Sequence, residues 1–256
     1  MKNPRKFVTK PQGGFSLIEL MIATLLFTVI SGVTFTLLGV ALKRYQVEKD
    51  YLNSFQQASV AMDEITRDVH TAGYPPLNAY TTAALAANTA NVATPFAWMP
   101  NYLPAIPCTV LATCTVPGPK DLITEADLGD GNGVQWVRYS LQGTTLMRGV
   151  VKKNGGGADP VAATSAALVP YLDNVMNYAS AAQMATIKAA YPSMFPGNAA
   201  VPVFTYSYDA GAAAQPPNIR EVNITLIVQS PRLDPNTQKV RAVLLTGQAV
   251  RINPNK

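Results

Sequence analysis

The feature that most constrains this chain is an uncharged apolar stretch near its N-terminus. The 23 positions from Leu20 to Leu42 contain no charged residue. As an α-helix with a rise of about 1.5 Å per residue, this stretch crosses the roughly 30 Å hydrocarbon core of a bilayer. It therefore predicts a membrane-spanning helix. A cleaved secretory signal fits less well, because the stretch is longer than the usual apolar region of a signal and no A-x-A-like site closes it.

One carboxylate, Glu19, lies at the start of the apolar segment, four residues after Phe15. An acidic side chain at membrane depth costs about 2.5 to 3.5 kcal/mol on insertion scales, so it is usually paired or functional. One interpretation is therefore that Glu19 has a specific partner. The other is an ordinary anchor helix whose Glu19 reaches back to the interface. The residues around Glu19 leave both interpretations open.

The run Gly13-Gly14-Phe15-Ser16-Leu17-Ile18-Glu19, after a short basic leader, resembles the processing signal of type IV pilins and pseudopilins. The resemblance implies that prepilin peptidase removes the leader, residues 1–14, by cutting between Gly14 and Phe15, and that Phe15 is then N-methylated. It also implies that Glu19 pairs with the new α-amino group of a neighbouring subunit. In a low-dielectric layer this attraction is weakly screened, while an unpaired charge stays costly.

The charges predict the topology of the chain. The basic excess lies in the leader, which holds four cations and no acid, so removal of residues 1–14 leaves sixteen basic residues against fifteen acidic ones, a net charge of +1. The pI near 9.2 therefore does not indicate a specific nucleic-acid partner. Cations before a span favour the cytoplasmic side, which predicts a cytoplasmic N-terminus and an extracytoplasmic segment 43–256. The resemblance implies the bacterial inner membrane, then a pilus or pseudopilus.

The helical pattern continues beyond the span. No proline occurs between Gln12 and Tyr74, which predicts one helix from Phe15 to about Ala72, with a membrane half at 15–42 and an amphipathic half at 43–73. Gly73 and the prolines after it are a stop signal. The expected apolar face repeats at intervals of three, four or seven: Tyr45, Leu52, Phe55, Met62, Ile65 and Val69.

The segment 62–74 narrows the resemblance. It is similar to the end of the long helix in PilW-type minor pilins and the related J-type pseudopilins, in which an Arg-Asp pair precedes an Ala-Gly-Tyr exit. Arg67 and Asp68 are the corresponding pair, and we expect them to interact with each other within the helix. The rest of the chain, residues 74–256, is expected to form an extracytoplasmic β-rich domain.

Alternating patterns predict the strands of this domain at 134–141, 144–151, 203–208, 221–229 and 239–252, with a bulge at Gly247. A short helix is expected at 179–190. Strands that follow one another without helices imply one antiparallel sheet, covered by the apolar helix face. The predicted fold class is therefore α+β and pilin-like, with a long N-terminal α-helix packed on a C-terminal antiparallel β-sheet domain.

Residues 75–119 show little periodicity and are predicted to form a surface insertion. Cys108 and Cys114 bracket five residues within it. In an oxidising exterior such a pair favours a disulfide. Two free or metal-binding thiols are the alternative, although the sequence lacks a second ligand pair for zinc.

The run Asp127-Leu128-Gly129-Asp130-Gly131-Asn132-Gly133 has the appearance of a calcium loop. It lacks the bidentate Glu and the regular acids of an EF-hand. A glycine-rich turn entering a strand is therefore the favoured interpretation. Whether a divalent ion binds near Asp127 and Asp130 is left open by the sequence. Solvated charges are expected at Arg138, Arg148, Lys152 and Lys153.

No catalytic constellation is recognisable. His70 is the only histidine, which excludes a histidine triad and a multi-histidine metal site. We therefore expect no enzyme, no cofactor and no metal. The function implied by the resemblance is a minor pilin that primes or caps a type IV pilus. Its implied partners are prepilin peptidase, other pilins or pseudopilins, the inner-membrane assembly platform and membrane lipid. The alternatives are a pseudopilin of type II secretion and a monomeric membrane-anchored binding or enzymatic domain.

Overall fold

The computed structural model describes residues 14–76, 79, 93, 96, 118–153, 160–212, 214, 216–234 and 237–252. It divides into two compact units, of which one ends at Gln46 and the other begins at Val47. The α+β class predicted from the sequence is confirmed, because a long N-terminal helix is followed by antiparallel sheets.

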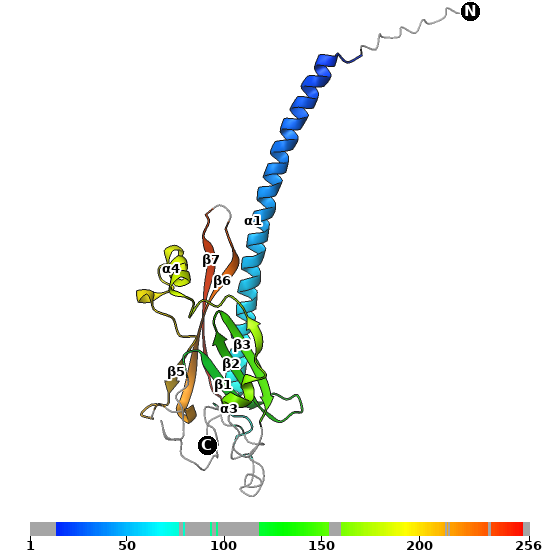
Figure 1. Ribbon diagram of the computed structural model, residues 1–256. Coiled ribbons are helices and arrows are strands. Elements are labelled where there is room, and N and C mark those ends of the chain that lie inside the picture. Colours follow the sequence, from blue (N-terminus) through cyan, green and yellow to red (C-terminus); the bar gives the residue numbers. More distant parts are fainter. Residues whose placement is uncertain are drawn as a thin grey trace, which may run out of the picture. The chain divides into compact units, whose positions relative to one another are not determined.

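The helix α1 runs without interruption from Leu17 to Thr71 (Figure 1). It ends where the sequence predicts. Gly73 takes a φ of +81°, a left-handed conformation that glycine adopts without a steric cost. The N–H of Gly73 then donates to the carbonyl of Glu125 at 2.8 Å, and the N–H of Asp127 donates to the carbonyl of Tyr74 at 2.8 Å. The exit of the helix is thereby held against the strand that contains these two acids.

The predicted single sheet is wrong in one respect, because the strands form two antiparallel sheets. The first has the order β1 (Asp121–Asp127), β2 (Val134–Gln142), β3 (Thr145–Lys152) and β4 (Val169–Leu172). The second has the order β5 (Phe204–Tyr208), β6 (Ile219–Leu233) and β7 (Val240–Val250). Five of these strands (β2, β3, β5, β6 and β7) lie where the alternating patterns predicted β-structure, with β6 longer than expected.

The two sheets are joined by the segments that follow β4 and precede β5. Val175 forms an isolated bridge with Val228 of β6. The buried side chain of Asn177 donates to the carbonyls of Val201 and Thr225 and accepts from the N–H of Ile227. These bonds satisfy backbone groups at the junction, where a buried unpaired group would be costly.

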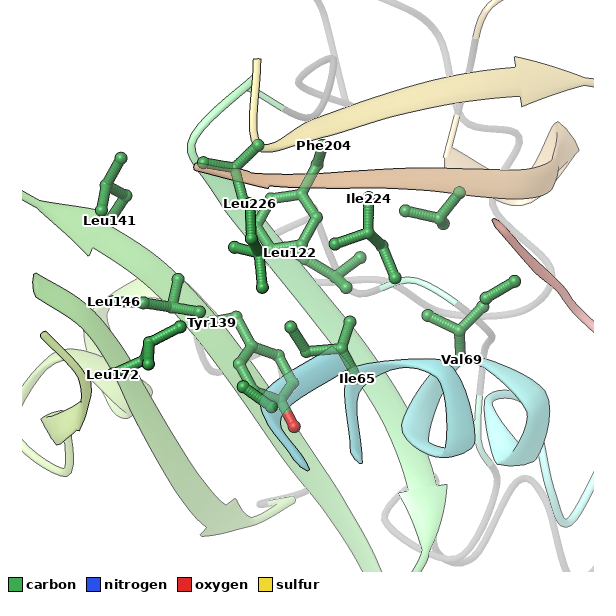
Figure 2. Close-up of a cluster of buried hydrophobic side chains, with 14 of the residues drawn as sticks. Ile65, Val69, Leu122, Tyr139, Leu141, Leu146, Leu172, Phe204, Ile224 and Leu226 are labelled. Carbon is green, nitrogen blue, oxygen red and sulfur yellow. The ribbon is translucent and has the colours of Figure 1, made fainter. Parts of the chain in front are cut away.

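One core lies between α1 and both sheets. Figure 2 shows Ile65 and Val69 of α1 pointing into the same cluster as Leu122 of β1, Tyr139 of β2 and Ile224 of β6. All five side chains are fully buried. The core therefore fixes the C-terminal part of α1 to both sheets.

The predicted helix face is only partly correct. Met62, Ile65 and Val69 pack on the core, but Tyr45, Leu52 and Phe55 are 65%, 49% and 40% exposed. Apart from Val47, the buried positions before Met62 are occupied by small residues: Ser54, Ala58 and Ala61. Small side chains allow a helix to approach a sheet closely, so the residues with the largest apolar side chains do not identify the buried face here.

Gly247 is not the site of a bulge. It pairs with Ile224 in a continuous register, and the irregularity of the β6–β7 ladder lies between Gln229 and Leu233. A Cβ added at Gly247 would lie 2.5 Å from Sδ of Met62, so the absence of a side chain there makes room for α1.

The shorter helices lie between strands. The helix α3 (Pro160–Ser165) follows β3, and α4 (Ala181–Ala190) matches the helix predicted at 179–190. Ser180 and Gln183 form a capping box at the start of α4, which satisfies two backbone donors of the first turn. Ile187 of α4 packs with Phe195 and Ile227 in a second, smaller cluster.

Candidate functional site

The candidate processing site lies immediately before α1. Gly14, Phe15 and Ser16 precede the first helical residue, Leu17. Phe15 is 90% exposed, and a Cβ added at Gly14 would meet no atom within 4 Å. The peptide bond between Gly14 and Phe15 is thus outside the helix and sterically open to a peptidase. The leader before Gly14 lies outside the described residues.

Glu19 lies in the first turn of α1. Its Oε2 accepts a hydrogen bond from the backbone N–H of Ser16 at 3.0 Å, as the glutamate of a capping box does. A carboxylate in this position also interacts favourably with the positive end of the helix dipole. The local backbone therefore holds the Glu19 carboxylate next to the Gly14–Phe15 bond.

The threonine side chains within the apolar part of α1 are hydrogen-bonded inside the helix. The hydroxyls of Thr24, Thr28, Thr34 and Thr36 each donate to the carbonyl four residues earlier, at 2.8 to 3.0 Å. Such bonds remove the cost of placing a hydroxyl in lipid. Among the described residues, α1 is the one helix long and apolar enough to cross a membrane.

Comparison with protein families gives a match to this same region. The model of the prokaryotic N-terminal methylation motif matches residues 9–35. The chain carries a prepilin-type methylation motif. It covers Gly14, Phe15, Glu19 and the first part of the apolar stretch, which supports a type IV pilin-like prepilin with an N-terminal membrane helix. Neither the curated proteins nor the solved structures include a match to this chain.

The methylation motif implies processing by prepilin peptidase and assembly with other pilins. It also agrees with a structural role rather than catalysis. The match ends at residue 35, so it describes the processing and membrane segment and does not extend to the β-rich domain. What the rest of the chain contributes has to be argued from its own residues.

The loop between β1 and β2 has the geometry of a glycine-rich turn. Oδ1 of Asp127 accepts from the N–H of Gly129 at 2.9 Å. Asp130 accepts from the N–H and side-chain amide of Asn132 and from the side chain of Gln135, and these bonds lower the pKa of its carboxyl. The carboxylates are therefore engaged by the loop itself. Within the described residues no group of three or more His, Cys, Asp or Glu side chains is placed to hold a metal ion.

The predicted disulfide between Cys108 and Cys114 falls outside the described residues, as does most of the 75–119 insertion. It stays a prediction.

A partly buried charge cluster joins the end of α1 to the first sheet. It consists of Glu64 and Asp68 on α1, Tyr139 on β2, Arg148 on β3 and Tyr171 on β4. Tyr139 donates to Oδ2 of Asp68 at 2.6 Å, and Arg148 lies 3.2 Å from the same oxygen. Arg148 also reaches Oε1 of Glu64 at 3.0 Å, and the hydroxyl of Tyr171 donates to Oε2 of Glu64.

The electrostatics of this cluster follow from its burial. Burial raises the pKa of Asp68 above its ordinary value, while the Tyr139 hydrogen bond and the charge of Arg148 act in the opposite direction. Burial and the neighbouring Asp68 carboxylate raise the pKa of Tyr139. Tyr139 therefore stays a neutral donor, and the cluster has one cation, Arg148, between two carboxylates.

This cluster corrects two predictions. Asp68 is not paired with Arg67 in the helix, because it points into the core while Arg67 lies 3.6 Å from Glu64 on the surface. Arg148 is not a solvated strand charge. One signal in the sequence marks Asp68, namely its position next to Val69 and three residues after Ile65, on the face predicted to be apolar. The partners of Asp68, Tyr139 and Arg148, have no such signal in the sequence around them.

Two further basic residues predicted to be solvated are buried. Lys153 Nζ lies 2.7 Å from Oε2 of Glu125, whose Oε1 accepts from the indole N–H of Trp136 at 2.7 Å. Arg138 pairs with Asp121 at 3.0 Å and reaches Ser165 of α3. Lys152 is exposed, as predicted. These pairs belong to the framework of the β-rich domain.

Proposed function

We propose that the chain is a minor pilin subunit that primes or caps a type IV pilus. The observation that carries the proposal is the coincidence of an open Gly14–Phe15 bond, Glu19 in the first helical turn and a methylation motif over residues 9–35. In this proposal prepilin peptidase cuts after Gly14 and methylates Phe15 before the subunit joins other pilins at the inner-membrane assembly platform.

Glu19 has a specific part in this proposal. Cleavage creates an α-amino group on Phe15, one residue before the N–H that Glu19 accepts from in the same chain. The amine of a neighbouring subunit offers a full positive charge, which is a stronger partner than a neutral amide. Exchange of the local bond for the charged one would favour assembly over the isolated subunit.

The proposed topology follows the charges. The basic leader stays in the cytoplasm, residues 15–42 cross the inner membrane and residues 43–256 lie outside. The division into a leader (1–14), a membrane half (15–42), an amphipathic half (43–73) and a β-rich domain (74–256) is part of this proposal, together with the disulfide between Cys108 and Cys114.

The mature N-terminus tests the class of protein. In cells with an active prepilin peptidase, mass spectrometry is expected to find a chain that begins with N-methylated Phe15. An intact leader in such cells would contradict the proposal and leave a monomeric membrane-anchored domain as the alternative. Cells without the peptidase provide the control, since the same chain should there keep Met1 to Gly14.

Glu19→Ala tests assembly separately from insertion. We expect normal membrane insertion and reduced recovery in sheared filament fractions, because the neighbouring amine loses its partner. Asp63→Ala is a matched control, since Asp63 is an exposed carboxylate of α1 outside the span. Equal recovery of both variants would remove Glu19 from the assembly mechanism.

A deletion strain distinguishes the pilus from the secretion alternative. Loss of surface piliation with normal protein secretion is expected for a minor pilin. Normal piliation with lost secretion would instead assign the chain to the pseudopilins.

A further inference from the structure

The two sheets have four edges, and three of these are protected in the part of the chain that the structure describes. The outer side of β1 is covered by the residues that follow α1, which exchange two backbone hydrogen bonds with it. β4 has four residues, and one of them is Pro170. β5 has five residues, and the N–H of Phe204 at its start donates to the carbonyl of Pro119. Covering, shortness and proline are known means of preventing unwanted pairing at an edge.

β7 forms the fourth edge and has none of these protections. It has 11 residues, and its register with β6 is continuous from Ala242 to Val250. This stretch contains no charged residue and no proline. Its outer side has no partner segment among the described residues. A long, regular and uncharged edge is a template for pairing with another strand.

The register decides which backbone groups of β7 point away from β6. Just after β7, the N–H of Arg251 donates to the carbonyl of Arg220 at 3.0 Å. Hydrogen-bonded pairs alternate along an antiparallel ladder, so the odd-numbered residues of β7 bond to β6. Thr225 of β6 agrees with this, because it is paired with Thr246 and its N–H donates to Val203 on the other side. The residues whose N–H and C=O groups point to the unpaired edge are therefore Ala242, Leu244, Thr246, Gln248 and Val250.

Contacts at two places hold α1 beside β7. At one, Arg241 of β7 pairs with Glu48, and Arg232 of β6 lies 3.2 Å from Asp50. At the other, Met62 lies against β7. The turns of α1 between these contacts therefore run alongside the strand.

Two apolar residues of these turns remain exposed, namely Leu52 at 49% and Phe55 at 40%. Tyr51 lies 5.8 Å from the guanidinium of Arg241, measured to the ring centre. Phe55 follows Tyr51 by one turn and precedes Met62 by two, so it lies on the side of α1 next to β7, and Leu52 adjoins it. Alternate side chains of a strand point to the same face. A strand added to β7 would therefore direct every second side chain toward Leu52 and Phe55.

We propose that the unpaired edge of β7, together with Leu52 and Phe55, is a docking site for an extended strand of a different pilin subunit. The occupant is uncharged, because residues 242–250 offer no charge to pair with, and it has apolar side chains on the side that faces α1. A copy of β7 itself fits less well, since its own α1 already covers that side. Backbone hydrogen bonds would supply affinity and the alternate side chains specificity. The choice of a pilin as partner rests on the proposed function.

Hydrogen exchange of the full chain tests the pairing at individual amides. In detergent micelles the N–H groups of Leu244, Thr246 and Gln248 should exchange fast, while those of Leu245 and Gly247 are protected by β6. In sheared filaments we expect the three even-numbered amides to exchange about tenfold more slowly or less, because a paired amide exchanges only when the pair opens. Unchanged exchange in filaments that contain the chain would overturn the docking site and leave the subunit role intact. Absence of the chain from filaments would instead contradict the proposed function.

Matched lysine substitutions test whether the edge is used in assembly. Thr246→Lys places a charge on the unpaired edge, and Thr205→Lys makes the same change at an exposed position of β5. Thr246→Lys is expected to lower recovery in sheared filaments by about fivefold or more, because a charged edge resists pairing. Thr205→Lys should be recovered as the wild type is, and both variants should still begin with N-methylated Phe15. Equal recovery of the two variants would overturn the docking site.

A photo-crosslinking residue at position 246 tests the identity of the occupant. We expect the crosslinked peptide to be an uncharged segment of a different chain that carries its own methylation motif. A crosslink to β7 of a second copy, or to a protein without such a motif, would overturn the choice of occupant.

Discussion

The phenol of Tyr139 donates a hydrogen bond of 2.6 Å to the carboxylate of Asp68, across 71 positions of sequence. It joins the last turns of α1 to the centre of the first sheet. Arg148, which is paired with Tyr139 across β2 and β3, contacts both groups. A buried carboxylate is tolerated only when donors surround it, so these three residues act as one unit that determines how α1 meets the sheet.

Tyr139→Phe is expected to lower the free energy of unfolding by about 1 to 3 kcal/mol, because the buried Asp68 carboxylate loses a donor while the ring stays in place. Denaturant unfolding of the full chain in detergent measures this. Tyr74→Phe is the control, since the Tyr74 side chain is exposed. Equal stability of the two variants would show that the Tyr139 hydroxyl contributes nothing.

The titration of Asp68 predicts a pH dependence of stability. Burial raises its pKa above the ordinary value of 3.8, so the folded state keeps the proton to a higher pH than the unfolded chain. Its contribution is therefore fully present below pH 3.8 and is lost as pH rises through the raised pKa. The free energy of unfolding of the wild type, compared with that of Asp68→Asn, should therefore fall as the pH rises from 3.8 through the raised pKa of Asp68. If the stability of the wild type relative to Asp68→Asn instead increases with pH, the interactions of Asp68 with Arg148 and Tyr139 outweigh the effect of burial.

Lys153→Met is expected to lower the free energy of unfolding by about 3 to 5 kcal/mol, because it leaves Glu125 buried without its cation. The double variant Lys153→Met with Glu125→Gln should recover a large part of the loss, since Gln keeps an acceptor for the Trp136 indole. The neighbouring Lys152→Met serves as control for the loss of one positive charge at an exposed position. A double variant no more stable than Lys153→Met would refute the argument.

Gly247→Ala is expected to lower the free energy of unfolding by about 1 to 3 kcal/mol, because the new methyl group overlaps Met62. Combined with Met62→Ala, the cost of Gly247→Ala should shrink, which a double-mutant cycle measures. Gly118→Ala provides the comparison, since a Cβ at Gly118 would meet no atom within 4 Å. If the losses from Gly247→Ala and Met62→Ala are additive, the cost of Gly247→Ala does not arise from its contact with Met62.

The sequence predicted those elements that local patterns specify. The long helix, its stop at Gly73 and the β2–β3 hairpin follow from periodicity and turn residues, and each is present. The buried face of α1 was predicted less well. Leu52 and Phe55 have the larger apolar side chains, but Ala58 and Ala61 are buried, because close approach to the sheets requires small residues there.

The candidate processing site could be proposed from the sequence alone, because Gly14, Phe15 and Glu19 lie within six residues of one another, and it stays a prediction. The buried charges could not, because a solvated arginine and a buried one have the same sequence signature. Arg148 alternates with apolar neighbours in β3 just as an exposed strand charge would. Only the register with Tyr139 and the approach of Asp68 remove most of its side chain from solvent.

By itself, the sequence of this protein determined an uncharged stretch long enough to cross a membrane, a carboxylate at its start and a helix that continues to Gly73, because each depends on residues close together in the chain. Only the tertiary structure decided that Asp68, Tyr139 and Arg148 form one partly buried cluster, and that the β6–β7 hairpin is attached to α1 at Glu48 and Asp50. Those contacts depend on strand register and on the approach of α1 to the sheets, which no local pattern of residues encodes.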